Sequence, residues 1–317
     1  MDSLLSAMKA AAEPTRLRLL VLCAHGDLTV SDLVQLLGQS QPRLSRHLKL
    51  LTEAGLLDRT REGSWVYFRL AHNGASASLA QTLVDALPDN DPTVQRDLQV
   101  LEELMGERAR RAEDYFRKVA ARWDELRALY VHDDEVEKQL CALITEEQVS
   151  DLLDVGTGTG RVLEILAEKV GHAVGVDLSS DMLMLARSKL QRARLRNCIV
   201  RKGDMHNLPL GEANFDAVTI HQVLHYAERP AKVIQEAARV LRPGGRLFIV
   251  DFQAHGLDFL RSEHEHRWLG FEEENMTDWL KAAGLKPEEC RRLKGDPLTI
   301  CIWTARLPAA RDRSQAA

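Results

Sequence analysis

The sequence of 317 residues predicts a multidomain protein: a mostly α N-terminal domain with a β-hairpin, a helical connector, and a C-terminal α/β domain built on a parallel sheet. Three observations predict this architecture. Short helical segments followed by a hairpin pattern occupy residues 3–75, a charged helical stretch covers 93–129, and apolar strands alternate with helices from 150 to 306. We place the domain boundaries at 1–90, 91–129 and 130–308, with a polar tail at 309–317.

Composition restricts the classes of function. The chain is 45% apolar and 28% charged with a formal net charge of −5, so any nucleic-acid interface must be a local basic patch. No apolar run reaches the roughly 18–20 residues of a membrane span, and the N-terminus lacks the pattern of a signal peptide. The five cysteines form no C-x-x-C pair, which argues against a zinc knuckle or a disulfide scaffold. We therefore expect a cytoplasmic protein.

Local signals set the helix boundaries of the N-terminal domain. Pro14 suits the first turn of a helix, and Thr29 with Asp32 resembles a capping box at the start of the next helix. Gly38 is a natural stop for that helix, and Ser40 is expected to cap a third. These signals predict three short helices before the hairpin.

The third helix carries a basic face. Leu44 and Leu48 belong to an i, i+4, i+7 stripe that predicts the buried side, while Arg43 and Arg46 project from another side. A hairpin pattern follows at 56–70 with a glycine in its loop. Between residues 40 and 70, six Lys or Arg oppose three Asp or Glu, so this segment is basic within an acidic chain.

Residues 10–72 closely resemble the ArsR/SmtB family of winged helix-turn-helix repressors. The phrases EPTRLRLLVLC, VSDLVQLLGQSQPRLSRHLKLLTEAGLL and REGSWVYFRL carry the resemblance. It implies a homodimer that inserts two recognition helices into a palindromic double-stranded DNA operator, with the hairpin as a wing on the backbone. The expected DNA contacts are Ser40, Gln41, Arg43, Ser45, Arg46, His47, Lys49, Arg59 and Arg61. Thr29 and Ser31 stand where metal-sensing members carry thiols, so we predict no metal site.

A glycine-rich turn opens the C-terminal domain. Gly156, Gly158 and Gly160 follow a predicted strand and precede a predicted helix, a context in which the backbone can approach a ligand closely. The dinucleotide fingerprint places its third glycine at position 161, which is Arg here, so NAD is disfavoured. The lysine and hydroxyl residue of a P-loop are absent as well. The turn alone leaves the identity of the ligand open.

Carboxylates at successive strand ends narrow the range of ligands that the glycine turn could bind. Asp177 ends the second strand about twenty residues after the glycines, where an acid can accept hydrogen bonds from both hydroxyls of a ribose. Asp204 follows the third strand and can bind an adenine amino group, and Asp154 can orient a ligand ammonium group. Three acids around one glycine turn predict a nucleoside site at the carboxyl ends of the strands.

Residues 150–255 resemble the class I S-adenosylmethionine-dependent methyltransferases, in the small-molecule branch related to the ubiquinone-pathway enzymes. Four motifs occur in order: LLDVGTGTGRVLEILAE, AVGVDLSSDMLMLAR, GDMHNLPLGEANFDAVTIHQVLHY and EAARVLRPGGRLFIVDF. The resemblance implies a Rossmann-like domain that binds S-adenosylmethionine or S-adenosylhomocysteine, and residues 115–127 resemble the helix that covers the cofactor. The binding residues that it implies are Asp154, Gly156, Thr157, Gly158, Gly160, Asp177, Leu178, Asp204, Met205 and His221.

These two halves suggest a transcriptional regulator, expected to be a repressor, whose second domain senses S-adenosylmethionine or S-adenosylhomocysteine. The alternative is an active small-molecule methyltransferase with an appended DNA-binding domain. Its catalytic residues remain unassigned, with His221, His225 and Tyr226 as candidates, and His255, His264 and His266 placed near them by the sequence. A nucleic-acid base methylase is disfavoured, because the stretch IHQVLHYAERP lacks the Asn/Asp-Pro-Pro-aromatic signature.

Overall fold

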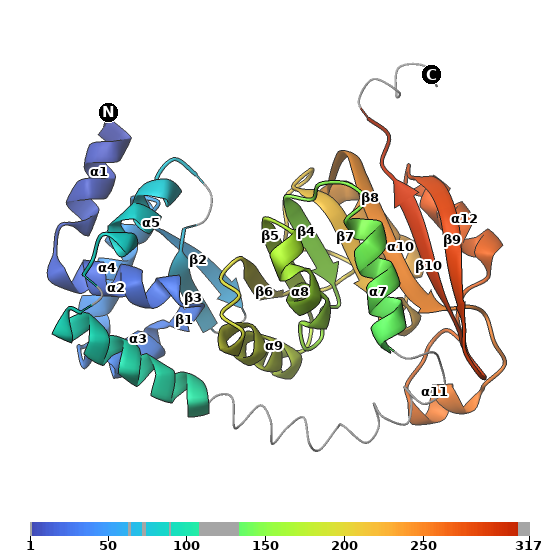
Figure 1. The fold of residues 1–317 in the computed structure, drawn as a ribbon, viewed down its shortest axis with the longest axis horizontal. Helices are drawn as coiled ribbons and strands as arrows, with labels where there is room; N and C mark the ends of the chain where they lie inside the picture. Colours follow the sequence, from blue (N-terminus) through green and yellow to red (C-terminus); the bar gives the residue numbers. More distant parts are fainter. Residues whose placement is uncertain (1, 63–64, 72–73, 89, 108–132, 310–317) are drawn as a thin grey trace. The chain divides into compact units, whose positions relative to one another are not determined.

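The computed structural model describes residues 2–62, 65–71, 74–88, 90–107 and 133–309, and the chain divides into an N-terminal and a C-terminal unit (Figure 1). The helix expected at 115–127 lies outside the described residues. In the described part, no helix is both long enough and apolar enough to cross a membrane.

The N-terminal unit combines short helices with a small antiparallel sheet in the order β1-β3-β2. The hairpin of β2 and β3 is the wing that the sequence predicts. The elements are α1 (Asp2–Ala11), α2 (Pro14–Ala24), β1 (Leu28–Thr29), α3 (Val30–Leu37), α4 (Gln41–Glu53), β2 (Leu57–Glu62), β3 (Trp65–Leu70), α5 (Ala77–Asp85) and a helical segment at 92–107.

Most of the predicted caps are present. The Thr29 side chain accepts a hydrogen bond from the Asp32 backbone N–H, and the Asp32 carboxylate accepts one from the Thr29 N–H, so the capping box is complete. Gly38 ends α3 in the left-handed conformation. Ser40 is different: it occupies the N-cap position of α4 but makes no capping hydrogen bond through its side chain. The expectation that Ser40 caps this helix is therefore wrong, and its exposed hydroxyl remains available to another partner.

Helix 92–107 packs into the core of the N-terminal unit. Leu101 and Leu104 are buried among the side chains of α2, α3 and α4. The buried carboxylate of Asp97 accepts hydrogen bonds from Nε and Nη2 of Arg18 in α2 at 2.6 and 2.7 Å. The segment that the sequence assigns to the start of the connector therefore shares one core with the helices before it.

The C-terminal unit is built on a seven-stranded sheet in the order β6-β5-β4-β7-β8-β10-β9. Strands β6, β5, β4, β7 and β8 are parallel, as the alternation of strands and helices predicts. The strands are β4 (Asp151–Val155), β5 (His172–Asp177), β6 (Cys198–Lys202), β7 (Phe215–His221), β8 (Leu241–Phe252), β9 (Lys286–Lys294) and β10 (Thr299–Arg306). The helices are α7 (Asp133–Ile144), α8 (Arg161–Leu166), η1 (Ala167–Lys169), α9 (Ser180–Arg192), η2 (Leu224–Tyr226), α10 (Pro230–Val240), α11 (Phe259–Glu263) and α12 (Glu273–Ala282).

The last two strands depart from the parallel sheet that the sequence suggested. β10 lies antiparallel to both β8 and β9. The sequence KPEECRRLK of β9 shows no apolar run because β9 is an edge strand whose side chains are mostly in contact with solvent. On one face of the sheet, α10 and α12 share a core with β7, β8 and β10.

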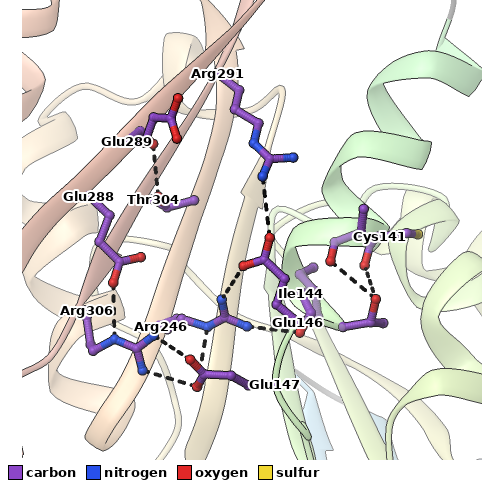
Figure 2. A network of polar contacts seen from close by, with 12 residues as sticks. Cys141, Ile144, Glu146, Glu147, Arg246, Glu288, Glu289, Arg291, Thr304 and Arg306 are labelled. Carbon is purple, nitrogen blue, oxygen red and sulfur yellow. Dashed lines mark hydrogen bonds and ion pairs between the residues drawn. The ribbon is translucent and has the colours of Figure 1, made fainter.

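Ion pairs cover the edge of the sheet where β4, β7 and β8 begin, and we call them the amino-edge network. Figure 2 shows its part around Arg246, which is buried and donates to the Ile144 carbonyl at the end of α7 at 3.1 Å. Arg306 of β10 pairs with Glu147 at 2.6 Å and with Glu288 of β9 at 3.1 Å. The other members are Glu146, Asp151, Asp216, Arg242 and Arg291. The network fastens α7 and the loop after it to the sheet.

Candidate cofactor site and DNA interface

The opposite edge of the sheet gathers the residues that the sequence predicts for a cofactor. Because β4, β5, β6 and β7 are parallel and adjacent, their carboxyl ends lie side by side. We call this edge the carboxyl rim. Its members are Asp154, Gly156, Thr157, Gly158, Gly160, Asp177, Leu178, Asp204, Met205 and His221.

The glycine turn after β4 needs glycine for two reasons. Gly156 has φ of 70°, and a Cβ at this position would lie 2.5 Å from Val223 Cγ2. Gly158 has φ of 53°, and a Cβ there would enter open space, so its backbone is accessible to a ligand. Arg161, in the position where a dinucleotide fold has glycine, donates to both carboxylate oxygens of Glu137 in α7 at 2.7 Å. This ion pair connects the end of the turn to α7.

Asp154 lies in the centre of the carboxyl rim and is 1% exposed. Thr219 Oγ1, on the neighbouring strand β7, donates a hydrogen bond to its carboxylate at 2.7 Å. Burial raises the pKa of Asp154 to about 6. A buried carboxyl group with a raised pKa is poised to bind a cation, because a positive charge nearby favours its ionised form.

Asp177 and Leu178 follow β5 directly. The Asp177 carboxylate accepts hydrogen bonds from the backbone N–H of Gly158 at 2.9 Å and of Ser179 at 2.8 Å. These bonds hold the carboxylate against the glycine turn and leave lone pairs for further donors. Leu178 is 65% exposed, an unusual state for a leucine, and it offers an apolar surface beside the acid.

Asp204 and Met205 follow β6. The Asp204 carboxylate accepts hydrogen bonds from the backbone N–H and the ring Nδ1 of His206, at 2.8 and 2.9 Å. These hydrogen bonds lower the pKa of Asp204, so this acid is ionised at neutral pH. Met205 is half-buried and packs against the core of the domain. The pair can therefore offer one acceptor and one apolar surface to a purine ring.

His221 ends β7, and its ring Nε2 is buried with no hydrogen-bond partner among the described residues. Burial lowers the pKa of His221, while the charges of Asp133 and Glu137 in α7 and of Asp251 in β8 oppose this effect. The ring is therefore a neutral group with a free nitrogen in an acidic environment.

The carboxyl rim fits an adenosyl ligand. Gly158 leaves space at the backbone, Asp177 keeps acceptor capacity for hydroxyl donors, and Leu178 exposes an apolar face beside it. Asp154 can hold the ammonium group of a methionine or homocysteine moiety, as the sequence predicts. All ten predicted residues lie at the ends of four adjacent strands, so the structure brings them together.

The catalytic candidates from the sequence also cluster, next to the end of β7. The rings of His225 and His266 stack with centroids 4.1 Å apart, and Tyr226 contacts both. The structure adds two residues that the sequence did not single out, Thr219 beside Asp154 and Asp251 beside His225. Asp251 could have been found from its position near the end of the apolar strand GRLFIVDF.

The predicted DNA-contacting residues of α4 lie on its solvent side. Leu44, Leu48 and Leu51 are buried, whereas Arg43 and Arg46 are exposed and form no ion pair within the part of the chain that the structure describes. His47 is half-buried, with Nδ1 3.8 Å from a carboxylate oxygen of Glu13. The remaining predicted contacts, all exposed, are Ser40, Gln41, Ser45, Lys49, Arg59 and Arg61.

The described residues contain no group of three or more His, Cys, Asp or Glu side chains arranged to hold a metal ion. All five cysteines are free thiols.

Two family models match the chain: the arsR family of bacterial regulatory proteins at residues 13–59, and a methyltransferase domain at residues 153–249. The demethylmenaquinone methyltransferase of Listeria welshimeri is 30% identical over 179 residues, which cover 49% of this chain and 76% of that enzyme. That of Thermotoga maritima is 33% identical over 150 residues, which cover 46% of this chain but only 63% of the enzyme, less than two thirds of its length.

Among solved structures, a protein from Bacillus halodurans described as a methyltransferase has the same fold, with a TM-score of 0.50 and 21% identity. The likeness covers 56% of this chain and 99% of that one. A methyltransferase domain of this type is the setting in which S-adenosylmethionine or S-adenosylhomocysteine binds, in agreement with the fit of the carboxyl rim. Residues 13–59 thus match the arsR family of bacterial regulatory proteins, and the chain belongs to the methyltransferase family that includes the demethylmenaquinone methyltransferases.

Proposed function

We propose that this protein is a DNA-binding transcriptional repressor in which the methyltransferase domain binds S-adenosylmethionine or S-adenosylhomocysteine as a signal. One observation carries the proposal: the same chain has an exposed basic recognition helix and a carboxyl rim that fits an adenosyl ligand. A regulator of this kind acts on chromosomal DNA in the cytoplasm.

The recognition helix supports the DNA-binding part of the proposal. Arg43 and Arg46 lie in the N-terminal half of α4, the part of a recognition helix that reaches base edges in the major groove. Their guanidinium groups suit guanine edges or phosphates. Gln41, also exposed at the start of the helix, suits an adenine edge.

An apolar surface on α1 supports a homodimer. Leu4, Leu5 and Met8 are 49%, 45% and 51% exposed, and an exposed apolar group of this kind is covered in most soluble proteins. A second copy of α1 would cover it through an isologous contact, which is self-complementary. In helix-turn-helix dimers the two recognition helices read half-sites about one DNA turn apart, so we expect a palindromic operator.

Coupling between the ligand and DNA requires that the ligand bind one arrangement of the dimer more tightly than another. A difference of about 1–3 kcal/mol is enough for a switch. The segment 93–129, which joins the two units along the chain, is the candidate to transmit it, and its described start is fixed to α2 through Arg18 and Asp97.

The test is DNA binding measured by fluorescence anisotropy, with an operator selected from a random DNA pool and with S-adenosylmethionine and S-adenosylhomocysteine titrated separately. We expect one ligand to change the operator affinity by about 5–150-fold. Arg46→Ala should weaken operator binding by roughly 10-fold or more and leave ligand affinity unchanged. Arg96→Ala, which removes an exposed arginine of helix 92–107, is the matched control. An operator affinity that is the same with and without either ligand at saturation would contradict the sensor proposal.

A second candidate function is methyl transfer to a small molecule, with the DNA-binding domain as an addition. The buried contact between His225 and Asp251 favours it, because a structural domain that only binds a signal needs no such pair. Its relatives in Listeria and Thermotoga are named as demethylmenaquinone methyltransferases. Transfer of a labelled methyl group from S-adenosylmethionine to a reduced naphthoquinone would support this function.

A further inference from the structure

The residues next to the end of β7 form a cluster that the sensor function does not use. We call it the histidine cluster, and it consists of His225, Asp251, His255, His264 and His266. His225 lies in η2, just after β7, and Asp251 lies near the carboxyl end of β8. The inference below rests on the second candidate function, methyl transfer.

His225 and Asp251 form a buried dyad. The side chains are 1% and 0% exposed, and Asp251 Oδ1 lies 2.8 Å from His225 Nδ1. The Asp251 carboxylate also accepts hydrogen bonds from the backbone N–H of His225 at 3.2 Å and of Phe252 at 2.8 Å. Because a carboxylate only accepts, Nδ1 of His225 carries the proton, and the lone pair of neutral His225 is therefore on Nε2.

Several buried ring nitrogens in the cluster lack partners. Within the described part of the chain, Nε2 of His225 and both ring nitrogens of His266 are buried without a hydrogen bond. His266 is 2% exposed and stacks on His225, so its ring covers the dyad. A buried polar atom without a partner destabilises the folded protein, so a ligand that brings a donor to these nitrogens can form the missing hydrogen bonds.

The cluster lies on the side of the carboxyl rim where an acceptor must approach. From one end of the rim to the other, the strand order β6-β5-β4-β7 places the predicted adenine, ribose and methionine contacts in sequence. His221 ends β7 and pairs in register with Val250, the residue before Asp251. The histidine cluster therefore continues the rim beyond the methionine end, away from the adenosine contacts.

We infer that His225 is a catalytic base, held in place by Asp251, that takes the proton of a neutral acceptor bearing a weakly acidic O–H group on a flat ring. S-adenosylmethionine supplies the electrophilic methyl group when it is bound. As the bond between the acceptor oxygen and the methyl carbon forms, the carbon–sulfur bond breaks, and the O–H proton passes to His225 Nε2. The products are the methyl ether, S-adenosylhomocysteine and an imidazolium that the Asp251 carboxylate stabilises.

The side chains that surround His225 are mostly aromatic rings. The rings of Tyr226, Phe252 and His266 contact His225 with centroids 4.1–5.4 Å apart, and rings of this kind stack on flat aromatic molecules. The groups that face His225 with a charge or a titratable proton are Asp251, Tyr226, His255 and His266. Burial, followed by the neighbouring His225, lowers the pKa of His266 to about 3, and burial also lowers that of His255. Both rings are therefore uncharged at pH 7, and neither places a positive charge next to His225 that would oppose its protonation.

The first experiment measures binding rather than turnover. The full-length protein saturated with S-adenosylhomocysteine is mixed with 4-nitrophenol, and the absorbance of the bound 4-nitrophenolate is recorded. We expect the wild-type protein to shift the probe toward its phenolate form and His225→Gln to abolish the shift. His172→Gln removes a partly exposed histidine at the start of β5, on the opposite edge of the sheet, and should behave as wild type.

The second experiment measures transfer of labelled methyl groups from S-adenosylmethionine to 1,4-dihydroxynaphthalene. His225→Gln should lower kcat by roughly 10²-fold or more, because a general base contributes about 10²–10⁴-fold. Asp251→Asn should also lower kcat strongly, because its amide N–H can donate to Nδ1 of His225 and move the ring proton to Nε2. Affinity for S-adenosylmethionine, measured by calorimetry, should stay within about twofold in both variants, which shows that the domain remains folded.

The outcomes separate this inference from the sensor proposal. Retention of the phenolate shift and of methyl transfer in His225→Gln overturns the role of His225. A wild-type protein that binds S-adenosylmethionine but neither shifts 4-nitrophenol nor methylates 1,4-dihydroxynaphthalene also overturns it, and leaves the sensor proposal intact. Absence of binding to S-adenosylmethionine and S-adenosylhomocysteine overturns both.

Discussion

The two edges of the C-terminal sheet use polar residues in opposite ways. At the amino edge, acids and arginines pair with one another: Arg242 bonds Asp151 and Asp216, and Arg306 bonds Glu147 and Glu288. At the carboxyl rim and in the histidine cluster, polar groups are buried without complete pairing, such as Asp154 and the ring nitrogens of His221, His225 and His266. Both edges belong to one sheet with one set of strands.

This difference in pairing shows that the amino edge stabilises the domain and that the carboxyl rim is the edge suited to bind a ligand. A paired amino edge lowers the free energy of the folded state and has little capacity left for a ligand. The Arg306 hydrogen bond lowers the pKa of Glu147, whereas burial raises that of Asp154, so the same type of group is stabilised as an anion at one edge and destabilised at the other. Unsatisfied buried groups persist where a ligand completes them.

The largest effect is expected from a substitution at the carboxyl rim. Asp177→Ala should weaken S-adenosylmethionine and S-adenosylhomocysteine alike by roughly 100-fold, because hydrogen bonds to a charged group are worth about 1.5–3 kcal/mol each and the Gly158 N–H loses its acceptor. Calorimetry with both ligands measures the change. Asp181→Ala, an exposed acid in the first turn of α9, is the control. Unchanged dissociation constants would place the ribose away from β5.

A comparable change at the amino edge should affect stability and not binding. Arg246→Met keeps the buried stem but removes the guanidinium group from the Ile144 carbonyl and from Glu146. We expect the free energy of unfolding to fall by about 2 kcal/mol and Tm by roughly 4–8 °C. Lys294→Met, on exposed β9, should leave Tm within about 1 °C. A loss of ligand affinity at 20 °C in Arg246→Met would show that the two edges are not independent.

Asp154→Asn tests the raised pKa. Because the folded protein holds this proton more tightly than the unfolded chain, the wild-type stability declines as pH rises from about 4 through about 6. The variant lacks this decline and should be about 1–3 kcal/mol more stable at pH 7, since one pKa unit corresponds to about 1.4 kcal/mol. Thermal unfolding across pH 4–8 measures it.

The same substitution should act on the ligand in the opposite direction. Wild-type affinity for S-adenosylmethionine should fall as pH drops below about 6, because protonated Asp154 no longer attracts the ammonium group. Asp154→Asn should bind more weakly at pH 7.5 and show no such pH dependence in calorimetry. An affinity that stays constant in the wild-type protein between pH 5 and 8 would contradict this role.

The smallest effect on stability is expected from an exposed ion pair of the amino-edge network. Arg306 is partly exposed, and exposed ion pairs contribute about 0–1 kcal/mol. Arg306→Gln should therefore lower Tm by no more than about 3 °C, and added salt should reduce the difference from wild type. A loss as large as that of Arg246→Met would mean that the exposed pairs act cooperatively with the buried one.

Much of the fold could be predicted from local sequence. The capping box of Thr29 and Asp32, Gly38 in the left-handed conformation and the leucine stripe of α4 depend on residues only three to seven positions apart, so local physics decides them. The members of the carboxyl rim could be predicted because parallel strands joined by helices place their ends at one edge, whichever residues fill the core.

The features that only the tertiary structure decided are contacts between residues far apart in the chain. The antiparallel β10 between β8 and β9, the burial of helix 92–107 through Arg18 and Asp97, and the Asp251 partner of His225 have no short-range signal. Ser40 shows the converse, since its position predicted a cap that the folded geometry does not form. Sequence thus determined the helices and wing of the N-terminal unit, the parallel strands of the C-terminal unit and the polar residues at their ends, because these depend on spacing along one segment. Packing decided which of those residues are buried and paired, because a partner supplied by another strand or helix is fixed only when the chain has folded.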